Sequence, residues 1–167
     1  FLLFCFAYNK FNRCYFYGLG PDENSCYHNS TIKLLFNPYY SYTKVFDNIY
    51  YISNLYDSNN VEVFDKSFGL LRCYNDYQNS DYITLSPGVN LMRRERSWTT
   101  IVPRNVISVD VNLYPDIFDV NNFNINRKFK ERLRDKYMTV DLVFINNGDN
   151  TKFVFHKIGC NYRISIR

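Results

Sequence analysis

Apolar positions along the chain gather in short runs between polar, asparagine-rich stretches, and the clearest runs lie in the second half. Residues 106–113 largely alternate apolar and polar side chains, which predicts a half-buried strand. Residues 139–145 form another apolar run and predict a second strand. The stretch 146–167 begins with a polar turn, continues through an apolar segment bearing His156 and Lys157, and ends in arginine. We expect this stretch to present cationic side chains on a small folded platform.

Helical spacing of apolar residues occurs in two segments. Residues 126–137 place Phe129, Leu133 and Tyr137 four positions apart, with basic side chains around the rest of the surface. Residues 25–36 also carry an apolar stripe at helical spacing, and an Asn-Pro pair that follows would end a helix. The pattern therefore predicts one helix in each half of the chain.

The remaining N-terminal pattern is shorter and mixed. Residues 45–52 and 61–64 predict strands, with the polar run at 57–60 as the turn between them. Residues 68–73 predict a short helix or strand, and 75–80 a loop.

A Leu-Ser-Pro-Gly turn at residues 85–88 separates two parts of opposite charge. Residues 1–91 hold six Lys or Arg against eight Asp or Glu, whereas residues 92–167 hold fourteen against eight. A polyanion would bind at the basic half, because neutralised phosphates release counterions. We therefore divide the chain into an aromatic-rich N-terminal extension, residues 1–88, and a basic core, residues 89–167.

The composition adds a bias of its own. The chain has 16 Tyr and 15 Phe but a single alanine, Ala7. Asn, Tyr, Phe, Ile and Lys are over-supplied by AT-rich genomes, so the composition indicates coding bias before it indicates fold. AT-rich organelles, parasites and large DNA viruses are the usual sources of such chains. No apolar run reaches the roughly 18 residues of a membrane span, and we expect no membrane partner.

The five cysteines are widely spaced and include no C-x-x-C pair. Cys14, Cys26 and His28 are an alternative set of metal ligands, but free thiols in a reducing compartment are favoured. We expect neither a metal nor a cofactor.

Short motifs in the basic half resemble those of the small-subunit ribosomal protein S-nineteen family. Residues 96–103, Arg-Ser-Trp-Thr-Thr-Ile-Val-Pro, are similar to that family's first motif, and residues 106–113 stand where its next strand lies. Residues 140–145 are similar to the paired strand, and 151–159, ending in His-Lys-Ile-Gly, to the Gly-His-Lys-Leu-Gly segment. Residues 161–167 stand in place of its basic tail.

This resemblance implies an α+β fold. The basic half would be a small three-stranded sheet with short helices, carrying an inserted helix at residues 115–137. Residues 1–88 would be a lineage-specific extension.

The resemblance and the charge together predict contacts to structured RNA through arginine, lysine and hydroxyl groups on loops and on the tail. Arginines bind phosphate with two parallel hydrogen bonds, and a histidine and lysine before a glycine place two donors at a sharp turn. The predicted RNA-binding residues are Arg93, Arg94, Arg96, Thr99, Thr100, Arg104, Lys152, His156, Lys157, Arg163 and Arg167.

The function implied is structural. The chain would be a non-enzymatic constituent of the head of the small ribosomal subunit in a mitochondrion. Its partners would be small-subunit rRNA and S-thirteen-like neighbours, near the tRNA path. The alternative is an enzyme: the Asn-Ser-Cys-Tyr segment at residues 24–27 resembles the nucleophile segment of papain-like proteases, with Cys26 as nucleophile and His156 as base.

Overall fold

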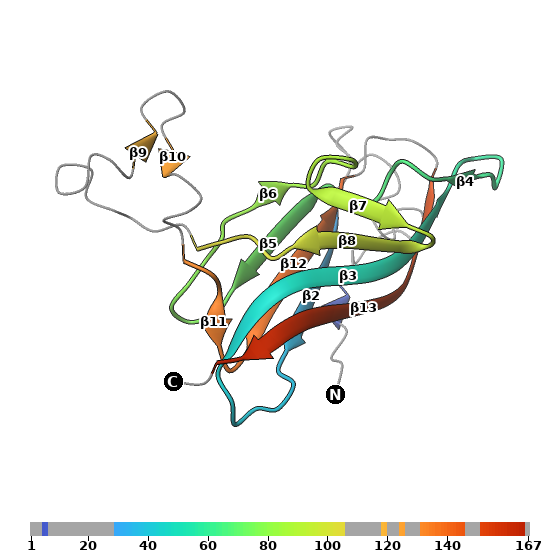
Figure 1. The fold of residues 1–167 in the computed structure, drawn as a ribbon. Helices are drawn as coiled ribbons and strands as arrows, with labels where there is room; N and C mark the ends of the chain where they lie inside the picture. The colour runs from blue at the N-terminus through green and yellow to red at the C-terminus, as the bar shows by residue number, and fades with distance from the viewer. Residues whose placement is uncertain are drawn as a thin grey trace, which may run out of the picture.

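The computed structural model describes residues 29–105, 131–145 and 151–165, together with the backbone of three short strands at Cys5–Phe6, Phe118–Asp119 and Asn124–Ile125. These residues contain strands and turns and no helix. Two antiparallel sheets face each other and share one core (Figure 1). A separate two-stranded hairpin is formed by β9 (Phe118–Asp119) and β10 (Asn124–Ile125).

The first sheet has five strands in the order β1-β2-β12-β5-β6. Its members are β1 (Cys5–Phe6), β2 (Ser30–Phe36), β12 (Met138–Phe144), β5 (Leu70–Tyr74) and β6 (Ile83–Thr84). The central strand β12 comes from late in the chain and pairs with β2 on one side and β5 on the other. This sheet therefore forms only when distant parts of the sequence meet.

The second sheet is built on β3 (Lys44–Tyr56), which pairs along its whole length with β13 (Lys152–Ile164). The other edge of β3 is shared by three strands in succession. These are β11 (Arg134–Asp135), β8 (Ser97–Ile101) and β4 (Glu62–Val63). Strand β7 (Leu91–Arg94) then pairs with β8.

Two bulges interrupt the β3–β13 ladder, one on each strand. His156 is the extra residue on β13, between the pairs Phe155–Ser53 and Lys157–Ile52. On β3 the register shifts at Asp47, which has no partner in the ladder. The buried positions of β3 change phase at this point, because the strand must restore its alternation after an added residue.

The core lies between the inner faces of the two sheets. Trp98, Tyr51 and Phe46 from the second sheet are each at most 2% exposed. Leu71 and Leu142 from the first sheet face them and are fully buried. Burial of this aromatic and aliphatic surface is the main favourable term in folding.

Asp141 is buried on the outer face of the first sheet, at the centre of a charged cluster. Its cross-strand neighbours are Lys33 and Arg72, and Arg72 donates two hydrogen bonds to Oδ2 at 2.7 and 3.1 Å. The Arg72 guanidinium also lies over the rings of Tyr74 and Tyr82, at 4.5 and 4.8 Å from their centroids. These contacts cover the carboxylate, so that Asp141 is 1% exposed although it faces away from the core.

The prediction of an α+β fold with a three-stranded sheet and short helices is wrong. The helix predicted over residues 25–36 overlaps strand β2, where Leu34 is buried, Ile32 and Phe36 pack beside it, and Leu35 is 60% exposed. This is the two-residue period of a strand. Of the three apolar residues used for the helical stripe, Ile32 and Phe36 fit both periods and Leu35 fits only the helical one, and pairing with β12 selects the strand.

The helix predicted over residues 126–137, and with it the inserted helix at 115–137, is also wrong for the part that the structure describes. Leu133 is fully buried, but it leads into strand β11 rather than forming one turn of a helix. The backbone that the structure describes earlier in this insertion is the β9–β10 hairpin. The strand predicted over residues 106–113 lies outside the described residues.

Other elements were predicted correctly. The strand expected at 139–145 is β12, the one at 45–52 is the longer β3, and the apolar run at 68–73 contributes strand β5. The turn at residues 57–60 is confirmed, with Asp57 Oδ1 accepting hydrogen bonds from two later backbone amides. The division of the chain at residue 88 stays a prediction, and strands from both sides of it share each sheet.

Candidate functional site

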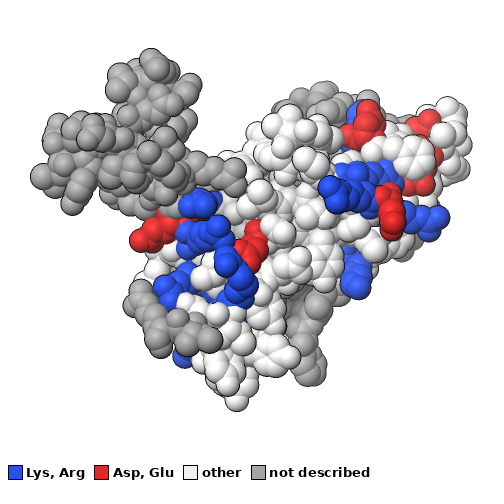
Figure 2. All heavy atoms as spheres, in the orientation of Figure 1, with Lys and Arg blue, Asp and Glu red and all other residues white. Residues whose placement is uncertain are grey.

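The predicted RNA-binding residues fall into separate groups. Figure 2 shows one cluster of basic side chains near strands β7 and β4 and another toward the opposite end of the molecule, near β11. Arg93, Arg94 and Arg96 lie on β7 and at its turn into β8 and form the first group. The second group contains Arg163, which shares Asp47 with Arg132, and Arg104, which lines one pocket with Arg132. Arg167 lies outside the described residues.

Arg93 has a structural role in the first group. Its Nη1 donates to the Phe64 carbonyl and its Nη2 to Glu62 Oε1, both at 3.0 Å. The guanidinium also lies over the rings of Phe64 and Trp98, at 4.8 and 5.3 Å from their centroids. Arg93 thus fastens the β4 segment against the sheet, while Arg94 and Arg96 are exposed at the β7–β8 turn.

His156 belongs to a polar network that starts at the β13 bulge. Its Nε2 is 2.7 Å from Asn54 Oδ1, and Asn54 Nδ2 donates to Glu62 Oε1 at 2.7 Å. The hydrogen bond from Asn54, assisted by the one from Arg93, lowers the pKa of Glu62. The network connects β13, β3, β4 and β7, and therefore ties the second sheet together at this end.

The other predicted residues differ in accessibility. Thr100 is 3% exposed and faces the core, while Thr99 is half-buried. Lys152 is exposed with its Nζ 6.0 Å from the centroid of the Tyr56 ring, and Lys157 is exposed beside the bulge. That these residues contact nucleic acid stays a prediction.

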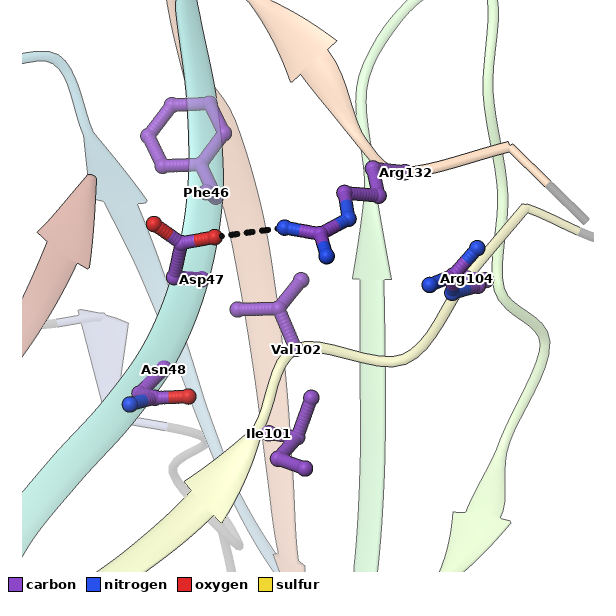
Figure 3. A pocket seen from close by; sticks show the side chains of 7 residues that line it. All are labelled: Phe46, Asp47, Asn48, Ile101, Val102, Arg104 and Arg132. Carbon is purple, nitrogen blue, oxygen red and sulfur yellow. Dashed lines mark hydrogen bonds and ion pairs between the residues drawn. The ribbon is translucent and has the colours of Figure 1, made fainter. Parts of the chain in front are cut away.

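Two arginines of the second group bind Asp47. Arg163 binds this carboxylate through two nitrogens, Nε to Oδ2 at 2.8 Å and Nη2 to Oδ1 at 2.9 Å. Arg132 donates from Nη1 to Oδ1 at 3.0 Å. Arg104 completes the group (Figure 3). The hydrogen bonds and the charge of Asp47 raise the pKa of Arg163.

A cavity of about 220 Å³ opens between these side chains, and we call it the arginine pocket. It lies where β3 bulges at Asp47, where β8 ends, and where the chain enters β11 (Figure 3). Its wall combines charged, amide and apolar side chains. The lining residues are Phe46, Asp47, Asn48, Ile101, Val102, Arg104 and Arg132.

A second accessible feature is the loop between β2 and β3, which we call the tyrosine loop (residues 37–43). It exposes Tyr39, Tyr40 and Tyr42 by 68%, 75% and 55%. The loop is held by the fully buried Lys44, whose Nζ donates to the carbonyls of Tyr39 at 3.1 Å and Tyr42 at 2.9 Å. The Tyr42 amide also donates to the Tyr39 carbonyl at 3.0 Å. The aromatic rings are therefore carried on an ordered turn.

The sequence analysis missed the residues that organise these two features. Asp47 and Arg132 are 85 positions apart, and no local pattern indicates that they pair. Lys44 resembles any surface lysine in the sequence. The tyrosine loop could have been predicted from the sequence. It has an Asn-Pro pair followed by three closely spaced tyrosines, and the whole segment lies between two apolar runs. This pattern is typical of an exposed aromatic turn.

Within the described part of the chain, no three His, Cys, Asp or Glu side chains are arranged to hold a metal ion. The alternative ligand set Cys14, Cys26 and His28 lies outside the described residues. In the described segments, the structure contains no helix that is long and apolar enough to cross a membrane.

The fold and these surfaces define a class of protein: an antiparallel β-sandwich module with an exposed aromatic turn and an arginine-lined pocket. The chain belongs to the family described as the Crassvirus muzzle protein C-terminal domain, which matches residues 21–105, about half of the 167 residues. No curated protein matches the chain.

This membership overturns the ribosomal interpretation. The family is a phage family, so the assignment to the S-nineteen family, the structural role in a small ribosomal subunit and the mitochondrial location are wrong. The predicted partners, rRNA and S-thirteen-like proteins near the tRNA path, are wrong for the same reason. The papain-like alternative has no support either: Cys26 lies outside the described residues, and the Nε2 atom of His156 lies 2.7 Å from Asn54 Oδ1.

Proposed function

We propose that this chain is a non-enzymatic structural component of a Crassvirus-like phage particle and acts as the C-terminal domain of a muzzle protein. The family match carries this proposal, because it covers strands β2 to β8, which contribute to both sheets. In this role the sandwich serves as a rigid module that contacts neighbouring proteins of the particle.

The tyrosine loop supports a role in protein contacts. Tyrosine and arginine are enriched at the centres of protein interfaces, since each offers a large, partly apolar surface together with hydrogen-bonding groups. Three exposed tyrosines on an ordered turn lose little conformational entropy on binding. The tyrosine loop, which Lys44 holds in one conformation, is thus suited to a lasting contact with another protein.

Location of the chain in purified particles tests the proposal. Phage particles are purified by density gradient, treated with nuclease and washed in protease-free buffer. They are then labelled with gold-conjugated antibodies against the recombinant chain. Label at one defined place on the particle, and a constant ratio of this chain to the major capsid protein by mass spectrometry, are expected. Detection of the chain only in the soluble fraction of infected cells would refute a structural role.

A further inference from the structure

We propose that the free edge of strand β13 binds an extended segment of a partner protein, which adds to the second sheet as a further strand and carries acidic residues on its outer face. This inference rests on the proposed function, because it names the surface and the chemistry through which the module would contact a neighbouring protein. It concerns β13 and does not depend on the tyrosine loop.

The backbone of β13 is paired on one side. The strand pairs with β3 and, among the described residues, with no other strand, and it lies at the border of the sheet (Figure 1). The Ser165 amide donates to the Thr43 carbonyl at 2.8 Å, so residue 165 directs its backbone groups toward β3. These groups alternate in direction along an antiparallel strand, so every second residue before Ser165 directs them away from β3. After the bulge, the residues of this set, which we call the edge residues, are Ile158, Cys160, Tyr162 and Ile164.

This stretch lacks the features that usually keep a sheet from accepting another strand. Natural edges are blocked by proline, by bulges or by charged side chains that point into the sheet. The bulge at His156 precedes the stretch, and residues 157–164 add no further residue to β13 and contain no proline. Within it, the side chains of the edge residues lie on the core side and are uncharged.

An added strand would gain both hydrogen bonds and apolar contacts. Ile158 belongs to the core, and Cys160 and Tyr162 pack against it. Ile164 continues the same row and is 46% exposed. A partner strand with apolar residues on this side would cover the rim of the core while its backbone bonds to the edge residues.

The charges on the outer face of β13 favour an acidic partner. Lys157 is exposed and makes no ion pair within the described residues. Lys152 is also exposed, and its Nζ lies 6.0 Å from the centroid of the Tyr56 ring. Arg163 is already bound to Asp47, and β13 itself contains no Asp or Glu. Acidic side chains on an added strand would form favourable cross-strand pairs with the two lysines.

The same charges disfavour a second copy of this chain as the added strand. If two copies of β13 paired antiparallel about Cys160, Lys157 of each copy would stand opposite Arg163 of the other. Like charges directly opposite each other destabilise a ladder. In every other register both strands would still contribute basic residues and no acid. The partner is therefore a different protein, with a segment that alternates apolar and acidic residues.

The inference is tested with the isotope-labelled full chain and the peptide acetyl-Glu-Val-Glu-Val-Glu-Val-Glu-amide, by hydrogen exchange followed by NMR. At saturating peptide the amides of the edge residues are expected to exchange about ten-fold more slowly, because they gain hydrogen bonds. The amides of Lys157, Gly159 and Asn161 point toward β3 and are expected to change by less than about two-fold. This alternation is the signature of an added strand.

Two variants locate the contact. Lys157→Glu is expected to weaken peptide binding about five-fold, because it replaces an attractive cross-strand pair by a repulsive one. The matched control is Arg94→Glu, which makes the same charge change at an exposed position of β7, and it is expected to change affinity by less than about two-fold. Ile164→Pro removes one outward amide that the ladder to β3 does not use, and is expected to weaken binding about three-fold.

Four results would overturn the inference. Protection could be absent or could appear without alternation. Lys157→Glu and Arg94→Glu could weaken binding alike, which indicates attraction by net charge. The peptide with lysine in place of glutamate could bind as tightly. The peptide-free chain could dimerise in sedimentation equilibrium with protection of the edge residues, which would make the occupant a second copy. None of these results bears on whether the chain is found in phage particles, so the two proposals fail separately.

Discussion

Gly159 lies opposite Tyr50 in the β3–β13 ladder, and the tyrosine ring covers it. A Cβ at residue 159 would lie 2.3 Å from the Cζ and Oη atoms of that ring. Glycine in a strand has no side chain to pack, and an aromatic residue across the ladder makes up for part of that loss. The glycine of the His-Lys-Ile-Gly motif is thus explained by packing on the outer face of a sheet.

Replacing Gly159 by alanine is expected to displace the Tyr50 ring and to destabilise the chain by about 1 kcal/mol, since the clash involves the movable end of a side chain. The same substitution in a Tyr50→Ala background is expected to be neutral or stabilising, because alanine then only restricts the unfolded chain. Urea unfolding of the four proteins measures the coupling. Equal effects in both backgrounds would contradict the packing explanation.

Cys160 is a second position whose chemistry is set by its surroundings. Burial, with a smaller contribution from the charge of Asp47, raises the pKa of its thiol to about 12. The thiolate is the reactive form, so alkylation of Cys160 at pH 8 is expected to be about a thousand-fold slower than for an ordinary thiol of pKa ~8.5. Peptide mass spectrometry after iodoacetamide treatment measures this rate, with the urea-unfolded chain as control.

The Asp47→Asn variant separates the two causes of this shift. It is expected to accelerate Cys160 alkylation only slightly, because burial is the larger cause. A large acceleration with retained folding would show that charge, not burial, protects the thiol.

At the scale of single elements, Lys44 determines the shape of the tyrosine loop. Its charge is buried and satisfied by two carbonyls of the turn, in line with the rule that buried charges require partners. Burial lowers the pKa of this lysine. The unfolded chain therefore holds the proton more tightly, and this cost to folding is relieved as pH rises from the lowered pKa towards 10.5.

The Lys44→Met variant is expected to change the free energy of unfolding by no more than about 1 kcal/mol, because the lost hydrogen bonds and the removed desolvation cost largely offset each other. The loop itself is expected to loosen, so that the Tyr42 amide exchanges with solvent about ten-fold faster. Hydrogen exchange followed by NMR measures this, with Lys152→Met, on the exposed side of β13, as control. Unchanged exchange at Tyr42 would show that Lys44 does not order the turn.

The sequence predicted those elements whose apolar runs are long or regular, such as β3 and β12. It failed for β2, since Ile32, Leu35 and Phe36 fit a helical stripe while Ile32, Leu34 and Phe36 fit one face of a strand, and the deciding partner β12 lies about a hundred residues further on. The ribosomal interpretation, which the family match overturns, rested on short motifs whose residues have structural explanations in this fold. Arg93 fastens β4, and Gly159 lies beneath a tyrosine ring. The arginine pocket could not be predicted, because it exists only after three segments converge.

At the scale of the whole molecule, the sheets connect parts of the chain on both sides of the family match. Residues 21–105 contain β2 and β5, but the strand between them, β12, lies beyond that region, as does β13, the partner of β3. The region that defines the family is therefore not a closed structural unit in this chain.

A fragment comprising residues 21–105 is expected not to fold, because it lacks the central strand of one sheet and the longest ladder of the other. Near-ultraviolet circular dichroism and the dispersion of NMR signals measure this. The full chain is expected to give one cooperative thermal transition in the same buffer. A well-dispersed spectrum from the fragment would show that the two late strands are dispensable.

The two bulges of the β3–β13 ladder have a consequence for how relatives of this chain vary in length. Each adds one residue to one strand while the pairs on either side keep their partners, so removing either residue leaves every pair in place. Single-residue gaps in family members are therefore expected at these two positions before any other position in the ladder. A gap at His156 removes only the contact with Asn54. A gap at Asp47 removes the carboxylate that Arg132 and Arg163 both bind. We accordingly expect the aspartate and the two arginines to be gained and lost together.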